Sequence, residues 1–290
     1  MKLCDIFNYA DDNTVCCVGD NVDDVKNKLH IVSSTMMKWF DANFMQANPS
    51  KFQFIVFDRV YEECSININE HVLTSQRSVK LLGIQIDSQL KFNLHISDIC
   101  KKAGRKLNVM ARLSNILDVD AKFLLFNSFI LSNFNFCPLI WHFCSITDMK
   151  QMEKIQKRAL MYTFNDFTSS YSELRLKAKK TLLYVNRLRL IVSEVYKCIH
   201  KLNPSYLHSL VHLRELNYDM RNTMYLQQPP FKYVKYGKDC FRYQSTKLWN
   251  LLDKKYKSSI TFKQFKQLIA EWNGPSCQCS FCEICVLATL

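Results

Sequence analysis

Glycine and proline are scarce in this chain of 290 residues, which has only 5 Gly and 6 Pro. The scarcity argues against a loop-rich binding fold and against nucleotide-binding folds built on glycine loops. In agreement, the sequence contains neither a GxGxxG fingerprint nor a GxxxxGK phosphate-binding loop. Hydrophobic residues make up 48% of the chain, with 20 Phe and 13 Tyr, so we expect a substantial folded core.

We expect no secretory leader, and the cysteines do not suggest a disulfide framework. There are 13 Cys, an odd number, scattered from Cys4 to Cys285. We therefore expect reduced thiols in a reducing compartment, nuclear and cytoplasmic rather than secreted.

No apolar run is uniform enough for a good membrane span. The most apolar stretch, Phe123 to Cys144, is interrupted by six residues that suit lipid poorly, namely Asn127, Ser128, Ser132, Asn133, Asn135 and Pro138. We expect this stretch to be buried helix, and we expect no membrane partner. His142 and Cys144 within it could form a pair of metal ligands, but a packed core role is favoured.

Acidic residues are scarce in the C-terminal part of the chain. Residues 1–100 hold 9 basic and 13 acidic residues, a net charge of −4, whereas residues 101–290 hold 30 basic and 13 acidic residues, a net charge of +17. RNA or DNA is the natural partner of the basic part, because each neutralised phosphate releases counterions. A charge that merely keeps the chain soluble is the alternative.

Apolar patterning in the first 90 residues indicates strands and one helix. The predicted elements are a hairpin of Leu3 to Tyr9 with Thr14 to Val18, a helix from Asn21 to Gln46, a strand from Phe52 to Phe57, a hairpin of Ser65 to Ile68 with His71 to Leu73, and a strand from Val79 to Asp87. This order is α+β rather than doubly wound.

After Asp87 the pattern becomes helical. One helix carries an apolar face of Ile96, Ile99, Ala103, Leu107, Met110, Leu113 and Leu117. Further helices are predicted at about 120–134, 147–163, 172–179, 184–202, 243–252 and 261–272. The segment from Leu216 to Gly237 is weakly patterned and is expected to be a long loop.

Two adjacent carboxylates, Asp11 and Asp12, lie at the predicted tip of the first hairpin within Tyr9-Ala10-Asp11-Asp12. With Asn13 they are turn formers. Neighbouring carboxylates repel each other, but a divalent cation turns the repulsion into attraction, and oxygen ligands suit Mg²⁺. A phosphoryl-transfer site can use such a pair. A solvated turn is the alternative, so the flanking sequence has to decide.

Further motifs follow this tetrapeptide in order. A helix passes through Trp39 and Asn43, and then come Asn48-Pro49-Ser50-Lys51 and Leu81-Leu82-Gly83-Ile84. With this ordered set the chain resembles a reverse transcriptase, and more narrowly the polymerase of a non-LTR (LINE-like, jockey-like) retrotransposon. Segments at residues 91–96, 137–141, 153–159 and 247–250 are similar to the region that follows the palm in such elements.

The resemblance implies RNA-directed DNA synthesis by two Mg²⁺ ions, with an RNA template, a DNA primer and dNTPs as partners. By the same resemblance, Asp11 would be a catalytic metal ligand supported by Asp12, and Lys51 would protonate or neutralise the pyrophosphate leaving group. Leu82 and Gly83 would lie in the primer grip.

Purely structural roles for these residues remain alternatives. Lys51 is equally an ordinary exposed turn lysine, and Leu81 to Ile84 are equally a core strand with a Gly where another backbone comes close. We expect Tyr9 to pack beneath the hairpin rather than to touch substrate.

Family members carry a fingers subdomain and two palm motifs before this hairpin, and the first of these motifs supplies another essential aspartate. Here the hairpin begins at residue 3, so we expect a missing N-terminal polymerase part. One hairpin cannot enclose two ions, and we therefore expect that this chain does not polymerise alone. We also expect an unpaired sheet edge with an uncovered apolar face, which is an association hazard.

Basic residues gather on the predicted helices after residue 95. The candidate nucleic-acid-binding residues are Lys101, Lys102, Arg105, Lys106, Lys154, Lys157, Arg158, Lys179 and Lys180. In the same helices, Arg187 would add to the basic surface, while Tyr162, Tyr171 and Tyr184 could stack on unpaired bases. A solvated helical face with its aromatics in the core is the alternative.

Four cysteines near the C-terminus form a C-x-C-x-x-C-x-x-C pattern of Cys277, Cys279, Cys282 and Cys285. Four thiolates so close together could bind Zn²⁺. The spacing would need a cramped loop, so a frayed reduced tail is the alternative.

The order of the elements predicts an α+β fold. The resemblance implies a partial polymerase palm of a β-hairpin, a helix and further strands, followed by a mostly α-helical thumb and C-terminal region. The expected parts are the C-terminal half of the palm at 1–90, a thumb-like helical region at 91–145, a basic helical region at 146–275 and a Cys-rich tail at 276–290. The expected function is that of a reverse transcriptase fragment. A non-catalytic nucleic-acid-binding protein derived from a retrotransposon is the alternative.

Overall fold

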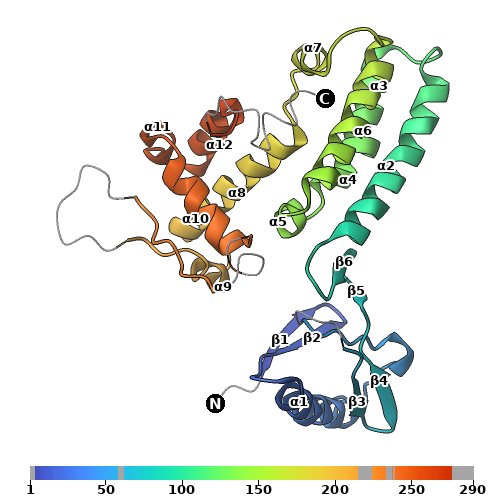
Figure 1. Ribbon diagram of the computed structural model, residues 1–290, viewed down its shortest axis with the longest axis vertical. Coiled ribbons are helices and arrows are strands. Elements are labelled where there is room, and N and C mark those ends of the chain that lie inside the picture. Colours follow the sequence, from blue (N-terminus) through green and yellow to red (C-terminus); the bar gives the residue numbers. More distant parts are fainter. Residues whose placement is uncertain (1–3, 58–61, 215–223, 233–236, 238, 276–290) are drawn as a thin grey trace. The chain divides into compact units, whose positions relative to one another are not determined.

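The structure is a computed structural model that describes residues 4–57, 62–214, 224–232, 237 and 239–275. It divides into two compact units, Met1–Leu90 and Lys91–Leu290, which we call unit 1 and unit 2. Unit 1 holds small antiparallel sheets and one long helix, and the described part of unit 2 is mainly helical (Figure 1). The predicted α+β class is confirmed.

Unit 1 begins with the predicted hairpin and helix. Strands β1 (Cys4–Tyr9) and β2 (Asp12–Cys17) pair as an antiparallel two-stranded sheet. Helix α1 (Val22–Ala42) follows, and the Asn21 side chain caps it by accepting a hydrogen bond from the Asp24 N–H at 2.9 Å. Asp23 and Asp24 lie in its first turn, where carboxylates suit the helix dipole.

The predicted strand from Phe52 to Phe57 is wrong. A short 3₁₀ turn, η1 (Pro49–Lys51), follows α1. Residues 52–57 come after it and do not form a β-strand. One backbone hydrogen bond anchors the segment, from the Gln76 N–H to the Phe54 carbonyl at 2.8 Å. The Phe54 side chain is buried and Phe57 is exposed, so an apolar run that looked like a strand is an irregular segment anchored by one buried side chain.

Two further hairpins complete unit 1. Strands β3 (Ser65–Ile68) and β4 (His71–Thr74) form the predicted hairpin about Asn69 and Glu70. The single strand predicted from Val79 to Asp87 is wrong, because the chain turns back at Leu82 and Gly83 to make β5 (Ser78–Leu81) and β6 (Ile84–Asp87). Both turn residues have positive φ, 46° and 87°, as a two-residue hairpin turn requires.

The core of unit 1 is small. Among its described large apolar side chains only Phe54, Ile66 and Ile84 are buried, and α1 has no fully buried residue. Several apolar side chains are instead exposed, including Ile6, Phe7, Val18, Trp39 and Phe44. The expectation of an uncovered apolar face on the hairpin is therefore confirmed.

The described part of unit 2 contains the predicted helices and two short ones that the pattern missed. The helical elements are α2 (Asn93–Leu113), α3 (Val119–Leu125), η2 (Phe126–Leu131), α4 (Ser132–Asn135), α5 (Pro138–Trp141), α6 (Ile146–Phe164), α7 (Tyr171–Lys177), α8 (Leu183–Ile199), α9 (Ser205–His208), α10 (Phe241–Leu251), α11 (Lys254–Lys257) and α12 (Phe262–Glu271). The missed ones are α9 and α11, each of a single turn. Helix α5 lies within the stretch from Phe123 to Cys144, which was expected to be helical.

Helix α2 buries the predicted face and exposes the basic one. Its buried residues include Ile96, Ala103, Leu107 and Met110, and it packs beside α6 and η2. The apolar pattern placed the C-terminal end of this helix too late, because α2 ends at Leu113 and Leu117 lies beyond it.

The apolar stretch after residue 122 is helical and partly buried. Its polar side chains bond to their own helix: Asn127 Nδ2 donates to the Phe123 carbonyl at 2.8 Å, and Asn133 Nδ2 donates to the Ile130 carbonyl at 3.0 Å. Phe126 and Phe134 are buried. Across the residues described, we find no helix with the length and apolar character needed to cross a membrane.

Candidate carboxylate site on the β1–β2 hairpin

The β1–β2 hairpin turns through two residues, Ala10 and Asp11, and the pair Tyr9↔Asp12 closes the turn. Asp12 is thus the first residue of β2 rather than part of the turn as predicted. Ala10 has a φ of 53°, a left-handed conformation that an L residue with a Cβ rarely adopts. The side-chain amide of Asn13 donates to the Asp11 carbonyl at 3.2 Å and supports this turn.

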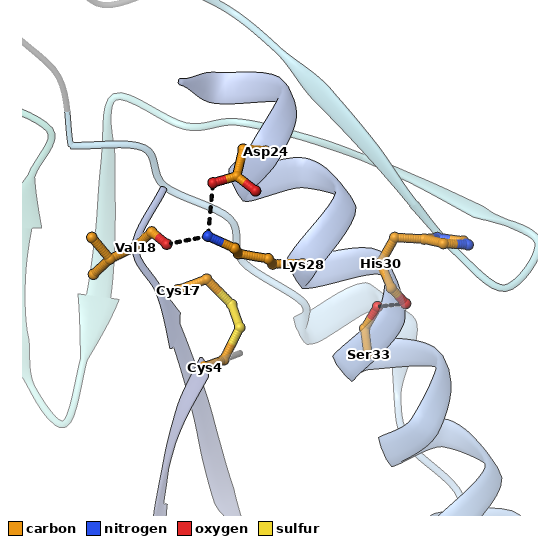
Figure 2. Close-up of a disulfide and its surroundings, with 7 residues drawn as sticks. All are labelled: Cys4, Cys17, Val18, Asp24, Lys28, His30 and Ser33. Carbon is orange, nitrogen blue, oxygen red and sulfur yellow. Dashed lines mark hydrogen bonds and ion pairs between the residues drawn. A yellow bond between two sulfur atoms is a disulfide. The ribbon is translucent and has the colours of Figure 1, made fainter. Parts of the chain in front are cut away.

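Alternation along the strands separates the hairpin into two faces. Tyr9 and Asp12 are opposite each other and share a face with Phe7, while Cys4, Ile6 and their partners on β2 share the other. Tyr9 is 68% exposed, so the prediction that it packs beneath the hairpin is wrong. The reason is that α1 lies by the face that carries Cys4 and Cys17, where Lys28 reaches across (Figure 2).

Asp11 and Asp12 are both exposed, and no ion pair to either is present among the residues described. The adjacent pair Asp23 and Asp24 differs in this respect, because Lys28 Nζ lies 2.7 Å from the Asp24 carboxylate. That contact is the main cause that holds the pKa of Asp24 below its ordinary value. Among the described residues, the two carboxylates at the tip are therefore not paired with a basic side chain.

The described residues do not by themselves form a complete metal site. Within the described ranges, no group of three or more His, Cys, Asp or Glu side chains is placed to hold one ion. Asp11 and Asp12 could supply at most two adjacent carboxylates. A two-metal centre needs further oxygen ligands from another strand.

Lys51 is the last residue of η1 and its side chain is exposed. Its position is fixed locally, since Asn48 caps the turn by accepting from the Ser50 N–H at 3.1 Å and the Lys51 N–H donates to the Asn48 carbonyl at 3.1 Å. In the described part of the chain no ion pair joins Lys51 to the tip carboxylates. Geometry therefore leaves both of its candidate roles open.

Leu82 and Gly83, the expected primer-grip residues, form the β5–β6 turn. Leu82 is half exposed, so the two residues lie at a hairpin tip rather than within a core strand.

Comparison of the chain with known protein families, with curated proteins and with solved structures finds no match. The resemblance described above therefore depends on the ordered motifs, and the structure adds the placement of their side chains.

The candidate nucleic-acid-binding residues of unit 2 are mostly on the surface. Exposed side chains are those of Lys101, Lys102, Arg105, Lys154, Arg158 and Lys179. The side chains of Lys106, Lys157 and Lys180 are partly buried. Lys106 Nζ donates to Asn133 Oδ1 at 3.1 Å, and Lys180 Nζ lies 5.4 Å from the centroid of the Phe123 ring. Partial burial lowers the pKa of Lys180.

Three residues of these helices are buried: for Tyr171 and Tyr184 the alternative of a core position is confirmed, and for Arg187 the expected surface position is wrong. Tyr171, Tyr184 and Arg187 lie in the interior, so neither tyrosine is placed to stack on an unpaired base. They surround Glu153, whose carboxylate accepts from the Tyr171 hydroxyl at 2.5 Å and from the Tyr184 N–H at 2.9 Å. Burial raises the pKa of Glu153, against the opposing effect of these hydrogen bonds. The aromatics and the acid form a polar core.

Glu153 was missed at the level of the sequence, although a signal existed. It falls on the apolar stripe of α6 with Met149, Gln156 and Leu160, all buried, at spacings of three or four residues. A carboxylate on such a stripe must find partners inside the protein.

His142 and Cys144 have the core role that the sequence favoured. Both are buried, and His142 stacks on Tyr184 with ring centroids 5.3 Å apart. Arg187 Nε lies 3.4 Å from His142 Nδ1. Burial, and then the charge of Arg187, hold the pKa of His142 well below its ordinary value, so its ring is neutral here.

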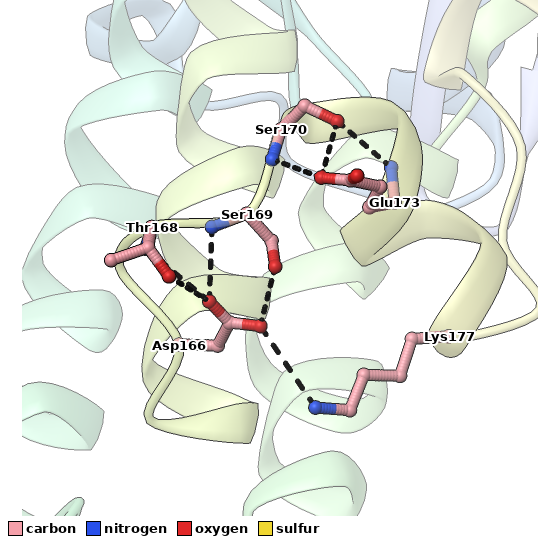
Figure 3. A network of polar contacts seen from close by, with 6 residues as sticks. All are labelled: Asp166, Thr168, Ser169, Ser170, Glu173 and Lys177. Atoms are coloured by element: carbon pink, nitrogen blue, oxygen red, sulfur yellow. Dashed lines mark hydrogen bonds and ion pairs between the residues drawn. The ribbon is translucent and has the colours of Figure 1, made fainter.

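The loop between α6 and α7 is a polar turn with a structural role (Figure 3). The Asp166 carboxylate accepts from the Ser169 N–H at 3.0 Å and lies 4.0 Å from Lys177 Nζ. Ser170 and Glu173 form a capping box at the start of α7. These bonds fix α7 and thereby place Tyr171 against Glu153.

The expectation of reduced thiols is wrong for one pair, because Cys4 and Cys17 form a disulfide across the hairpin. The other described cysteines, among them the exposed Cys16 next to Cys17, are free thiols. The proposed zinc ligands Cys277, Cys279, Cys282 and Cys285 lie outside the described residues.

Proposed function

We propose that residues 1–90 are the C-terminal half of a reverse transcriptase palm of the non-LTR retrotransposon type, followed by helical regions that bind nucleic acid. The observation that carries the proposal is the pair of exposed, uncompensated carboxylates of Asp11 and Asp12 at the tip of a hairpin that α1 backs. The ordered motifs around Trp39, Lys51 and Leu82 support it.

In this proposal each hairpin residue has a distinct task. Asp11 binds metal from the turn, and Asp12, one residue on at the start of β2, supports the same ion. Bound Mg²⁺ would activate the primer 3′-hydroxyl and offset charge on the nucleotide triphosphate. Lys51 neutralises or protonates the departing pyrophosphate. The turn at Leu82 and Gly83 contacts the primer end through its backbone.

The catalytic centre of the proposal is incomplete within the described residues. Two carboxylates on one hairpin leave the ions short of ligands, and the apolar side chains of Phe7 and Tyr9 on the same face remain exposed. A further polymerase part with another aspartate-bearing strand would both complete the ligand set and cover these side chains.

Primer extension tests the incompleteness directly. The purified chain, given an RNA template, a DNA primer and dNTPs with Mg²⁺ or Mn²⁺, is expected to incorporate no nucleotide above a no-protein blank. Robust incorporation that Asp11→Asn abolishes would contradict the claim that the site is incomplete.

The second candidate is a non-catalytic nucleic-acid-binding protein derived from such an element. The exposed basic side chains on α2 and α6 favour it. The two candidates differ on Asp11: its change to Asn removes metal binding in the first and leaves RNA binding intact in both. A loss of metal binding in that variant therefore favours the polymerase descent.

A further inference from the structure

The register of the β1–β2 hairpin brings Cys4 opposite Cys17. A two-residue turn is closed by a hydrogen-bonded pair, here Tyr9↔Asp12, and hydrogen-bonded and non-hydrogen-bonded pairs alternate along an antiparallel ladder. Five pairs further on, Cys4↔Cys17 is a non-hydrogen-bonded pair. Its Cα–Cα separation of 4.4 Å agrees with the roughly 4.5 Å of such pairs, so the ladder itself prepares the two thiols to join.

The cysteine pair lies at the open end of the hairpin, next to its attachment to α1. Lys28 Nζ of α1 donates to the Val18 carbonyl at 2.9 Å, directly after Cys17, and also to the Asp24 carboxylate at 2.7 Å (Figure 2). Gly19 follows, and a Cβ there would lie 2.5 Å from Asp24 Oδ2, so the chain passes close to α1 at this point. The disulfide holds the strands to each other, and Lys28 holds β2 to the helix.

A two-stranded hairpin with exposed strands is marginally stable in water. Both β1 and β2 are largely exposed, and within the described ranges their sheet contains no third strand. The bond between Cys4 and Cys17 closes a loop with a sequence separation of 13 that contains the whole turn. Closing a loop of this size favours the ordered hairpin by a factor on the order of 100.

We propose that Cys4 and Cys17 form a redox-sensitive clamp that sets the order of the hairpin tip bearing Asp11 and Asp12. The oxidant class is a small-molecule disulfide, of which glutathione disulfide is the representative. One thiolate attacks it to give a mixed disulfide and one glutathione thiol, and the other cysteine displaces the second glutathione. Two electrons and two protons pass from the cysteine pair to two glutathiones, and excess glutathione reverses the exchange.

The clamp acts on the geometry of the tip and needs no bound metal. An experiment that disproves the redox clamp therefore leaves the proposed relation to reverse transcriptases untouched, and the reverse also holds. When the bond is open, the strand ends separate and the turn at Ala10 and Asp11 loses its fixed register. When it is closed, the two carboxylates stay in the arrangement described above.

The test compares the full chain in buffers of reduced glutathione and of glutathione disulfide. Alkylation with mass spectrometry reports the state of Cys4 and Cys17, and amide hydrogen exchange reports the hairpin. In the oxidised buffer both thiols should become protected together, and exchange of the β1 and β2 amides should slow by a factor on the order of 100. Exchange in α1 serves as the reference for a folded unit 1.

Two variants sharpen the result. Cys17→Ser should exchange rapidly in both buffers, whereas Cys16→Ser, which removes the adjacent exposed thiol on the opposite face, should keep the full response. If Cys17→Ser also loses the protection of α1, the comparison of the two buffers in the unchanged chain decides alone. Thiols that stay reactive in the oxidised buffer, or hairpin exchange that is equal in both buffers, would overturn the proposal.

Discussion

At the scale of single residues, one buried carboxylate organises the interior of unit 2. Glu153 is fully buried, and its partners come from the start of α7 and of α8. A buried acid contributes to stability only while its hydrogen bonds are complete, because removing one partner leaves a desolvated oxygen.

We expect Tyr171→Phe to lower the free energy of unfolding by about 1.5–3 kcal/mol, since it removes one donor to a buried acid and leaves the ring in place. Urea denaturation followed by circular dichroism measures this. Tyr162→Phe is the matched control, because Tyr162 lies on α6, the helix of Glu153, and is only partly buried, so its change should affect the stability little. Equal effects of the two changes would mean that the Tyr171 hydroxyl has no special role.

Residue types alone predicted the placement of some of these individual residues. The adjacent carboxylates at a hairpin tip followed from strand-forming residues around Asp11 and Asp12, and the core role of His142 followed from its apolar neighbours. The interior position of Tyr171 and Arg187 did not follow, because a tyrosine or arginine on a basic helix can face either way until its partner is known. The Cys4–Cys17 pair needed the register of the two strands, which the apolar pattern did not specify.

At the scale of elements, helices were predicted better than strands. The three- and four-residue spacing of apolar positions in α1, α2 and α6 specifies one apolar stripe over several turns, and this stripe is buried in α2 and α6. An apolar run of six to nine residues specifies much less, and so Phe52 to Phe57 and Val79 to Asp87 were both misassigned. The turn between β5 and β6 was also hard to predict because Leu82 precedes Gly83, whereas Asn is the usual residue before Gly in a two-residue hairpin turn.

The exposed stripe of α6 carries a prediction about nucleic acid. Lys154 and Arg158 are one turn apart and both exposed, so they can neutralise phosphates on one strand. Changing both to Glu should weaken binding of single-stranded RNA and reduce the slope of log affinity against log salt by about 2, one unit for each lost contact. Fluorescence anisotropy over a salt series measures both quantities.

Lys247→Glu with Lys254→Glu is the matched control, with the same charge change on exposed positions of α10 and α11. It should affect binding less than the α6 pair does. If both pairs weaken binding equally, net charge rather than the α6 stripe determines the affinity.

At the scale of the whole molecule, the two units differ in how much apolar surface they bury. Unit 1 buries few large side chains, whereas unit 2 has buried aromatics such as Trp141, Tyr196, Trp249 and Phe265. We therefore expect unit 1 to unfold first. In a urea series followed by hydrogen exchange, peptides from 4–57 should lose protection at a lower urea concentration than peptides from α2, α6 and α8.

A single transition shared by both units would contradict this expectation. The prediction follows from burial rather than from the number of elements, since α1 and α2 are of equal length, 21 residues, and differ in their buried faces. The sequence did not reveal this difference, because both helices have a regular apolar stripe and only the structure tells which stripe has a partner.

The central claim is that the hairpin tip retains a carboxylate site for a divalent cation, and paramagnetic broadening by Mn²⁺ tests it most directly. The chain supplies its own control, because Asp23 and Asp24 are also adjacent but are offset by Lys26 and Lys28. With Mn²⁺ well below the protein concentration, amide resonances from Ala10 to Asn13 should broaden first, and Asp11→Asn should abolish the effect. Equal broadening at Asp23 and Asp24, or broadening at the tip that survives Asp11→Asn, would contradict the claim.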